Sequence, residues 1–272
     1  LFAACASLPG REPYAIGRES GEKIMELRRE RTSADSEVAL MTLTVVSRDG
    51  EVVQREILSA TRRTSSGGQQ YLIRFTDPSD VRGTTLLSLE QEDGNVRQFL
   101  FLPALGQVTE ITGDARQGSF MGSDFTYEDL QRESIADFDY TYVGDSRIGA
   151  DRVYKIVAMA SSPGRKRITG YARRILYVDQ ESLNIERIEF FDANNINHKT
   201  LEAFGYGSAD VEGESIRPQK AIMENNRSET TSILTLRVSR LDVSLEADRF
   251  TPEAIANWTE ADTRAVLEAG RE

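Results

Sequence analysis

The feature that most constrains the fold is a succession of short segments in which apolar and polar residues alternate. The first of these, residues 37–46, places an apolar side chain at every second position: Ala39, Met41, Leu43 and Val45. A period of two residues is the pattern of a β-strand. Asp49-Gly50 then favours a hairpin turn, because these residue types accept the positive φ that tight hairpins require. The next strand is expected over residues 51–60.

The same pattern recurs along the chain, with turn residues between the segments. Further strands are expected at residues 70–76, 84–90, 96–102 and 108–112, and the pattern resumes beyond residue 140. Because no helical pattern separates these strands, the sequence predicts an antiparallel meander of about eleven or twelve strands rather than a βαβ fold. Two short helices are expected, over residues 21–31 after Ser20 and over residues 261–269 after Thr259.

Composition narrows the possible functions. The chain has 272 residues, with 33 Lys and Arg against 44 Asp and Glu, which gives a net charge of −11. This acidity disfavours nucleic-acid binding, which needs clustered basic residues. The chain has one Cys and one His, which excludes an intrachain disulfide, multi-Cys or multi-His metal sites and most His-based relays. No cofactor and no metal are expected.

The first residues have the character of an export signal. Leu1 to Ser7 reads as an apolar run followed by small residues, as at the end of a secretory signal. Two processing routes are open, and a third interpretation is that these residues are simply a frayed chain end. Cleavage after Ala4-Cys5-Ala6 would release a free protein, whereas Phe2-Ala3-Ala4-Cys5 resembles a lipobox in which Cys5 is acylated. Residues 1–10 are therefore expected to be a residual signal or tether, and residues 11–272 one domain.

The regular pattern is interrupted in the middle of the chain. Residues 113–130 contain Gly113, Gly118 and Gly122 together with four large apolar side chains: Phe120, Met121, Phe125 and Tyr127. Long structured loops in compact domains are often lids or binding elements. The alternative, which the composition alone favours, is a loop tucked over the end of the sheet with its aromatic residues in the core.

Three runs in this region resemble a known bacterial family. They are Pro78-Ser79-Asp80-Val81-Arg82-Gly83-Thr84, Phe101-Leu102-Pro103-Ala104-Leu105-Gly106, and Gly118-Ser119-Phe120-Met121-Gly122-Ser123-Asp124-Phe125-Thr126-Tyr127-Glu128-Asp129-Leu130. Together they are similar to the outer-membrane lipoprotein-sorting-like proteins, relatives of the LolA and LolB carriers. The sequence departs from that family after the Pro-Ala-Leu-Gly turn, where basic residues are common but Gln107, Thr109 and Glu110 stand here.

The resemblance implies a mainly β fold: a single-domain, incomplete antiparallel β-barrel with a few short helices covering its open side and an apolar cavity between them. It further implies a non-enzymatic periplasmic carrier or chaperone for lipid or acylated lipoprotein cargo, working beside an inner-membrane exporter. A monomer is expected, either soluble in the periplasm or tethered to the outer membrane through Cys5. The competing interpretation is an envelope interaction protein, either a sensor or a transporter accessory subunit.

The aligned apolar faces of the strands are the candidate cavity lining. They comprise Met41, Leu43, Val45, Tyr71, Ile73, Phe75, Leu87, Leu89, Ile188, Phe190, Leu234, Leu236 and Val238. The candidate gating loop at the mouth comprises Phe120, Met121, Asp124, Phe125 and Tyr127. Periodicity does not distinguish a hollow barrel from one filled by the same side chains, and here the resemblance favours the hollow one.

Other candidate residues carry less weight. His198 lies in an Asn-rich stretch expected to be a turn, without a second His or a nearby Cys for a relay. Asp124, Glu128 and Asp129 cluster beside aromatic residues, and a hydrolase using Asp124 or Glu128 is the weakest of the three functional hypotheses. Arg165-Lys166-Arg167 is expected to be a solvated basic turn.

Overall fold

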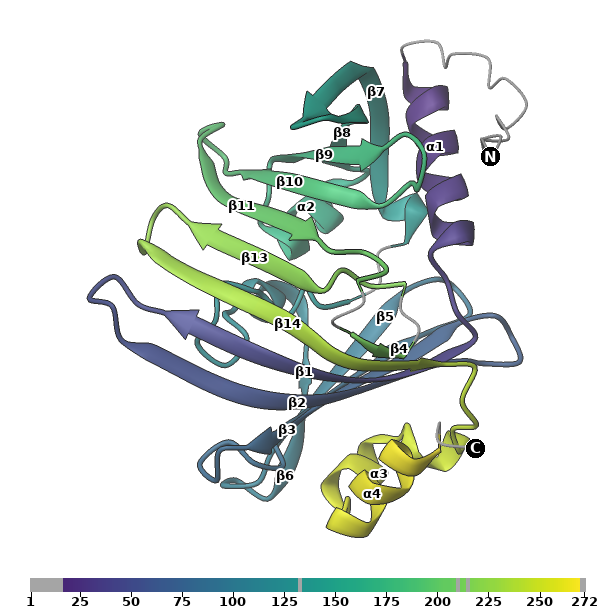
Figure 1. Ribbon diagram of the computed structural model, residues 1–272, viewed down its shortest axis with the longest axis vertical. Coiled ribbons are helices and arrows are strands. Elements are labelled where there is room, and N and C mark those ends of the chain that lie inside the picture. Colours follow the sequence, from purple (N-terminus) through teal and green to yellow (C-terminus); the bar gives the residue numbers. More distant parts are fainter. Residues whose placement is uncertain (1–16, 132–133, 209–210, 214–215, 270–272) are drawn as a thin grey trace, which may run out of the picture.

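A computed structural model describes residues 17–131, 134–208, 211–213 and 216–269 (Figure 1). One large antiparallel sheet dominates, in the order β6-β5-β4-β3-β2-β1-β14-β13-β11-β10-β9-β8-β7, with the short β12 paired parallel to β14. The strands are β1 Ser36–Val46, β2 Val52–Arg63, β3 Gln69–Asp77, β4 Thr85–Glu90, β5 Val96–Leu102, β6 Gln107–Ile111, β7 Phe138–Ile148, β8 Asp151–Ala160, β9 Arg173–Asp179, β10 Ile185–Phe191, β11 Asn197–Phe204, β12 Glu212–Gly213, β13 Lys220–Asn225 and β14 Thr230–Leu241.

The sheet is open. Among the described strands, β6 and β7 are the ends of the pairing order and do not pair with each other. The sheet therefore curves around a concave face without closing into a full barrel. The two halves of the chain meet at its centre, where β1 pairs with β14 over most of their length.

Four α-helices and three short 3₁₀ helices complete the described structure. They are α1 Arg18–Arg31, α2 Pro163–Thr169, α3 Pro252–Ala256, α4 Glu260–Glu268, η1 Gly113–Gln117, η2 Ile135–Asp137 and η3 Ala247–Arg249. None of the helices in the described ranges is both long and apolar enough to cross a membrane.

Helix α1 lies against the concave face of the β7 end of the sheet. Ile24 and Met25 are buried there against residues of β7, β8 and β9, including Tyr140 and Leu176. A Cβ on Gly21 would lie only 2.5 Å from the carbonyl oxygen of Tyr140. The absence of a side chain at Gly21 is therefore what lets the helix backbone approach the strand so closely.

The C-terminal helices pack on the opposite, outer face. Trp258 and Val266, from this C-terminal region, belong to a buried cluster with residues of β1 to β5 such as Leu58, Leu72 and Leu87. Figure 1 shows α3 and α4 on the far side of β1 and β2 from α1 and from strands β7 to β11. The first half of the sheet is consequently covered on both faces, which explains why its strands are apolar on both sides.

The predicted class is confirmed: the protein is mainly β, with one open antiparallel sheet and a few short helices. The described residues contain fourteen strands rather than about eleven or twelve, and α1 begins at Arg18 rather than after Ser20. Residues 165–167, expected to be a solvated basic turn, belong to helix α2, because Ser162 caps its N-terminus and Pro163 occupies its first position. Residues 1–10, including Cys5, lie outside the described residues.

Candidate functional site

The concave face encloses a cavity of about 480 Å³. This volume lies within the range of roughly 300–1,000 Å³ that is usual for small-molecule sites. Helix α1 forms one wall, strands from both halves of the sheet form the floor, and the loop after η1 forms another wall. Its apolar lining includes Met25, Met41, Leu43, Ile57, Ile73, Phe120, Phe125, Leu130, Leu176, Ile188 and Leu234.

The alternation of strand side chains explains why these residues meet. Met41 in β1 pairs with Ile57 in β2, and Leu43 in β1 pairs with Leu234 in β14. Residues that lie directly opposite each other in a sheet point to the same face. The concave face of the first half is therefore apolar across four adjacent strands, β14, β1, β2 and β3.

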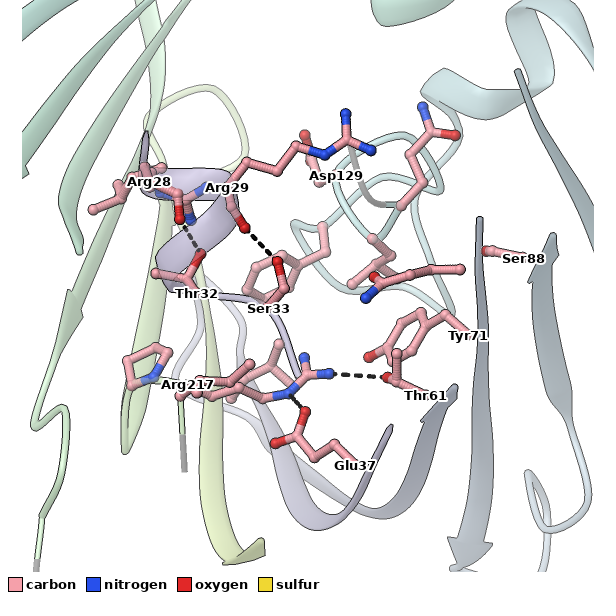
Figure 2. Close-up of a pocket in the computed structure, with 18 of the residues that line it drawn as sticks. Arg28, Arg29, Thr32, Ser33, Glu37, Thr61, Tyr71, Ser88, Asp129 and Arg217 are labelled. Atoms are coloured by element: carbon pink, nitrogen blue, oxygen red, sulfur yellow. Dashed lines mark hydrogen bonds and ion pairs between the residues drawn. The ribbon is translucent and has the colours of Figure 1, made fainter. Parts of the chain in front are cut away.

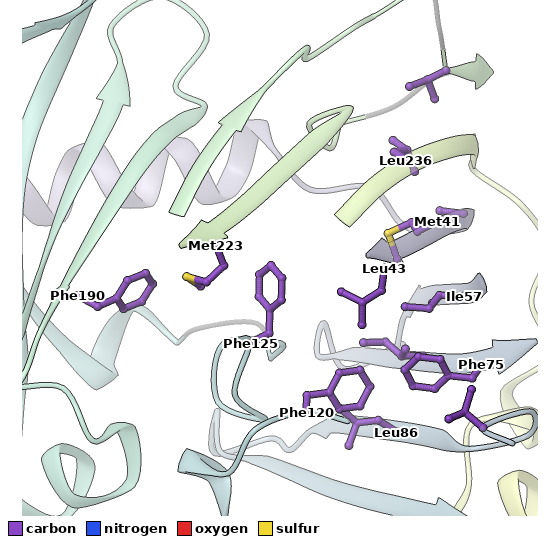
Figure 3. Close-up of a cluster of buried hydrophobic side chains, with 14 of the residues drawn as sticks. Met41, Leu43, Ile57, Phe75, Leu86, Phe120, Phe125, Phe190, Met223 and Leu236 are labelled. Carbon is purple, nitrogen blue, oxygen red and sulfur yellow. The ribbon is translucent and has the colours of Figure 1, made fainter. Parts of the chain in front are cut away.

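The predicted lining residues fall into three groups. Six of them border the cavity: Met41, Leu43, Tyr71, Ile73, Ile188 and Leu234. Four others belong to the hydrophobic cluster of the concave face without bordering the cavity: Val45, Phe75, Phe190 and Leu236 (Figure 3). The concave face is thus partly hollow and partly filled by side chains.

The remaining three were placed on the wrong face. Leu87 and Leu89 point outward and pack in the cluster beneath the C-terminal helices, whereas Leu86 belongs to the concave cluster. Strand β4 has leucines on both faces, so alternation alone does not reveal which face is inside. Val238 pairs with Leu40, which is also in the outer cluster, because a bulge shifts the register between Leu40 and Met41. A one-residue shift turns the side chains to the other face.

The loop of residues 118–131 lies within the concave face. Phe120 is 2% exposed and Phe125 is 5% exposed. The Phe120 ring centroid lies 5.5 Å from that of Phe75 and 5.7 Å from that of Tyr127, the latter in an edge-to-face arrangement. Met121 and Tyr127 pack against the same cluster. Figure 3 shows Phe120 and Phe125 directed at the side chains of the sheet.

Asp124 fastens the middle of this loop to β13 and β14. Its carboxylate accepts hydrogen bonds from the Ser232 hydroxyl at 2.7 Å and from the Asn225 amide at 3.1 Å, and a further one from the Thr230 hydroxyl. Its backbone N–H donates to Ser232 Oγ at 2.8 Å. The carboxylate of Asp124 is therefore a structural anchor of the loop.

Asp129 fastens the C-terminal end of the loop. Lys199 Nζ in β11 lies 2.9 Å from Asp129 Oδ2 and 3.0 Å from the Asp124 carbonyl oxygen. The Tyr171 hydroxyl donates to Asp129 Oδ1 at 2.9 Å, and the Thr126 N–H donates to Oδ2 at 2.9 Å. Burial by itself raises the pKa of the Asp129 carboxyl, but Lys199 and the hydrogen bonds outweigh burial and hold the pKa below its usual value.

Glu128 pairs with a residue that the sequence placed in solvent. Arg165 in α2 is 8% exposed and forms ion pairs with Glu128 and with Asp137, the latter at 3.2 Å. The expectation of a solvated Arg165 is wrong, because helix α2 packs against η1 and directs this side chain inward. All three acidic residues of the loop therefore have structural partners.

His198 is the second residue of β11 rather than part of a turn. Its ring centroid lies 5.8 Å from that of Tyr171. Desolvation, helped by the nearby Arg227 and Lys199, lowers the pKa of His198. Among the residues that the structure describes, no three or more His, Cys, Asp or Glu side chains gather as a metal-binding group.

The cavity also has polar lining residues, which neither the strand alternation nor the motifs predicted (Figure 2). Arg28 and Arg29 of α1, Arg174 of β9, and Glu37 and Arg217 border it. Arg217 Nε lies 2.5 Å from Glu37 Oε2, and the Ser239 hydroxyl donates to Glu37 Oε1 at 2.9 Å. A signal was present in β1, because Glu37 stands at the position of the inward-facing series that Ala39 and Met41 continue.

Burial by itself lowers the pKa of the Arg217 guanidinium, but the Glu37 carboxylate and the Tyr71 hydroxyl raise it above its usual value. The guanidinium carbon of Arg217 lies 5.4 Å from the centroid of the Tyr71 ring. Arg217 is therefore a fixed cation at the floor of the cavity, beside the apolar lining of β1.

Comparison with known proteins shows which family the chain belongs to. A family model described as "-like: Uncharacterized protein" matches residues 67–257, more than half of the chain. The chain belongs to this family. No curated protein matches it. The matched range includes all three runs that resemble the lipoprotein-sorting-like proteins, together with the loop of residues 118–131.

Solved structures show the same fold. A candidate outer membrane lipoprotein-sorting protein domain from Vibrio parahaemolyticus has a TM-score of 0.80 at 24% identity, covering 88% of this chain and 99% of its own. A DUF1329 family protein from Desulfovibrio piger has a TM-score of 0.79 at 20% identity, with 89% and 100% covered. A LolA superfamily protein from Nitrosomonas europaea has a TM-score of 0.66 at 18% identity, with 87% and 98% covered. The resemblance to the lipoprotein-sorting-like proteins is thereby confirmed for the fold.

Proposed function

We propose that this family member is a non-enzymatic periplasmic carrier that shelters an acyl chain of a lipid or acylated lipoprotein. The observation that carries this proposal is the cavity of about 480 Å³ on the concave face, with Met41, Leu43, Ile73 and Leu234 in its lining. The lipoprotein-sorting fold of the structural relatives supports the same function. A carrier of this kind receives its cargo at the inner membrane, so the proposal includes an exporter as partner.

The energetics of acyl binding are sufficient. Each methylene moved from water into an apolar site gains about 0.8 kcal/mol, so ten methylenes gain about 8 kcal/mol before the cost of immobilising the chain. Micromolar affinity corresponds to a net gain of about 8 kcal/mol, so an acyl chain of about fifteen methylenes, which gains about 12 kcal/mol, reaches it when immobilisation costs about 4 kcal/mol. A cargo held by one such chain binds tightly enough to stay out of water and weakly enough to be released.

The loop of residues 118–131 has a defined part in this proposal. Phe120 and Phe125 both border the cavity and fill part of the concave face. We propose that a second or longer acyl chain takes the place of these rings when the loop swings out. The anchors at Asp124 and Asp129 oppose that movement, and they limit access until a membrane or a partner protein favours the open state.

Filling the cavity tests the carrier proposal. Leu234→Trp places a large side chain in the cavity, whereas Ile233→Trp, at the next position of β14 and therefore on the other face, is the matched control. Native mass spectrometry of gently purified protein and titration with a dodecyl-chain amphiphile measure occupancy. We expect Leu234→Trp to lose at least tenfold in affinity, as about two lost methylene contacts would produce, with the control unchanged. A folded wild-type protein that binds neither lipid nor acyl peptide overturns the proposal.

The mode of attachment is a separate part of the proposal. We propose that the mature protein is periplasmic, either free or tethered to the outer membrane through Cys5. Expression with the complete natural leader followed by intact-mass measurement separates the two. Acylation adds the mass of the lipid to a chain that begins at Cys5, whereas cleavage beyond it yields an unmodified shorter chain. Retention of an uncleaved leader in the cytoplasm would contradict both the free and the tethered periplasmic form.

A further inference from the structure

We propose that the polar side of the cavity binds the anionic head group of the cargo, so that the preferred ligand is an acyl chain ending in a carboxylate or phosphate. This inference rests on the proposed carrier function and specifies the chemical class of its cargo. Four arginines from three parts of the chain carry it: Arg28 and Arg29 of α1, Arg174 of β9, and Arg217 before β13. All four border the same cavity.

The charge of the cavity is opposite to that of the protein. The described residues that border it include these four arginines and three carboxylates, Glu37, Glu90 and Asp129, so the lining has a net charge of 4 − 3 = +1. Asp129 is in addition paired with Lys199 from behind the lining, at 2.9 Å. The whole chain carries −11. A positive cavity in an acidic protein favours an anionic ligand over a cationic one.

Arg29 is the residue best placed to meet a head group. Its guanidinium extends into the cavity from α1, and that of Arg217 lies below it in this view (Figure 2). Arg29 contacts Glu90 at 3.2 Å through one terminal nitrogen, and the second oxygen of Glu90 accepts from the Gln69 N–H at 3.0 Å. A guanidinium has five N–H donors, so the Glu90 contact leaves Arg29 with donors for an incoming anion.

The position of Arg29 fits the path of an amphiphile. Arg29 also borders an outer depression lined by Glu26 and Glu30, and it therefore stands between the solvent and the interior of the cavity. The Arg29 side chain is 33% exposed, so a contact with it is only partly screened by water. An acyl chain lying along Leu43 and Leu234 would leave its head group at this arginine. Guanidinium groups bind carboxylate and phosphate with two parallel hydrogen bonds, which makes them selective for such heads.

The test compares probes that share a chain and differ in the head group. Dodecyl phosphate, dodecyl maltoside and dodecyltrimethylammonium are titrated below their micelle concentrations into the full protein by calorimetry, with inorganic phosphate as a fourth ligand. We expect wild-type protein to bind dodecyl phosphate about tenfold more tightly than dodecyl maltoside, as one charge-assisted hydrogen bond provides, and dodecyltrimethylammonium least. Inorganic phosphate alone should bind at least a hundredfold more weakly than dodecyl phosphate.

Variants assign the preference to Arg29. Arg29→Gln should lose about tenfold for dodecyl phosphate and leave dodecyl maltoside unchanged. The double variant Arg29→Gln/Glu90→Gln removes the unpaired carboxylate that the single change leaves, and it should show the same selective loss. Arg31→Gln is the matched control, because Arg31 lies on the same helix and contacts the Glu181 carbonyl instead of the cavity. It should bind all probes as wild type does.

Each contrary outcome has its own meaning. Equal affinities for the three dodecyl probes would overturn the head-group proposal while leaving the carrier function intact. No binding of any dodecyl probe would overturn the carrier function itself. Inorganic phosphate as tight as dodecyl phosphate would identify a site for a free anion rather than for an amphiphile. An unchanged preference in both Arg29 variants would remove Arg29 from the proposed site.

Discussion

Replacement of Asp129 by asparagine tests whether the buried ion pair holds the loop of residues 118–131 in the concave face. The Asp129 side chain is 7% exposed and that of Lys199 is 5% exposed. The change keeps the shape of the side chain and removes its charge. Lys199 then keeps the carbonyl of Asp124 and the faces of the Tyr171 and Phe190 rings, at 5.1 and 5.2 Å, but loses the carboxylate charge that neutralises its ammonium.

The expected loss of stability is large because the ammonium of Lys199 stays buried without its counter-charge. Removing one partner of a buried ion pair costs about 3–5 kcal/mol. For a chain of this size each kcal/mol shifts Tm by about 2–4 °C, so the Tm of Asp129→Asn should fall by roughly 6–20 °C. The double variant Asp129→Asn/Lys199→Met should recover most of this loss, because replacing both members of a buried pair by groups of similar size is often nearly neutral.

The pH dependence has a definite sign. Because Lys199 and the hydrogen bonds hold the pKa of Asp129 below its usual value, this carboxylate stabilises the fold fully above the unfolded-state pKa of about 4. The stabilisation is lost as the pH falls below 4 and through the lower pKa of the folded state. The difference in stability between wild type and Asp129→Asn should therefore be constant from pH 5 to 7 and shrink in stronger acid.

Urea and thermal unfolding followed by circular dichroism measure both effects. Asp114→Asn is the matched control, because Asp114 precedes the same loop but is 69% exposed and pairs with Arg167 at 3.5 Å; its free energy of unfolding should change by less than about 0.5 kcal/mol. Two results would refute the reasoning. One is a free energy of unfolding that falls by less than about 1 kcal/mol in Asp129→Asn at pH 7. The other is a difference in unfolding free energy between wild type and Asp129→Asn that grows in acid.

Two further substitutions test the packing around the site. Gly21→Ala should destabilise the protein by about 1–3 kcal/mol in urea unfolding, because the added Cβ would meet the Tyr140 carbonyl at 2.5 Å. Gly164→Ala is the control, because the nearest atom to its added Cβ is 3.9 Å away. Equal losses of stability in the two variants would contradict the close approach of α1 to β7. Leu87→Ala should cost about 2–5 kcal/mol without changing amphiphile affinity, because Leu87 packs under the C-terminal helices. A selective loss of binding in this variant would place Leu87 inside the cavity after all.

Local sequence patterns predicted the positions of individual strands well, but they predicted less well which face of each strand points into the concave side of the sheet. The period of two residues located β1 and β5 almost to the residue, because side-chain alternation is a local property of a strand. Leu87 and Val238 were assigned to the wrong face, since β4 is apolar on both sides and the bulge in β14 is set by its pairing with β1. The aromatic loop was found by its composition, but its place inside the concave face depends on partners in β11, β13 and β14.

The sequence by itself determined the antiparallel meander, the acidic exterior and the absence of the residue sets that most metal sites and histidine relays require. It also determined the resemblance to lipoprotein-sorting-like proteins, because the runs that carry it are continuous. Only the tertiary structure decided which apolar residues enclose a cavity and which fill the core. It alone brought Arg217 to the cavity that Arg29 and Glu37 border, because Arg217 lies far from both in the chain and joins them only when the sheet curves and α1 packs across it.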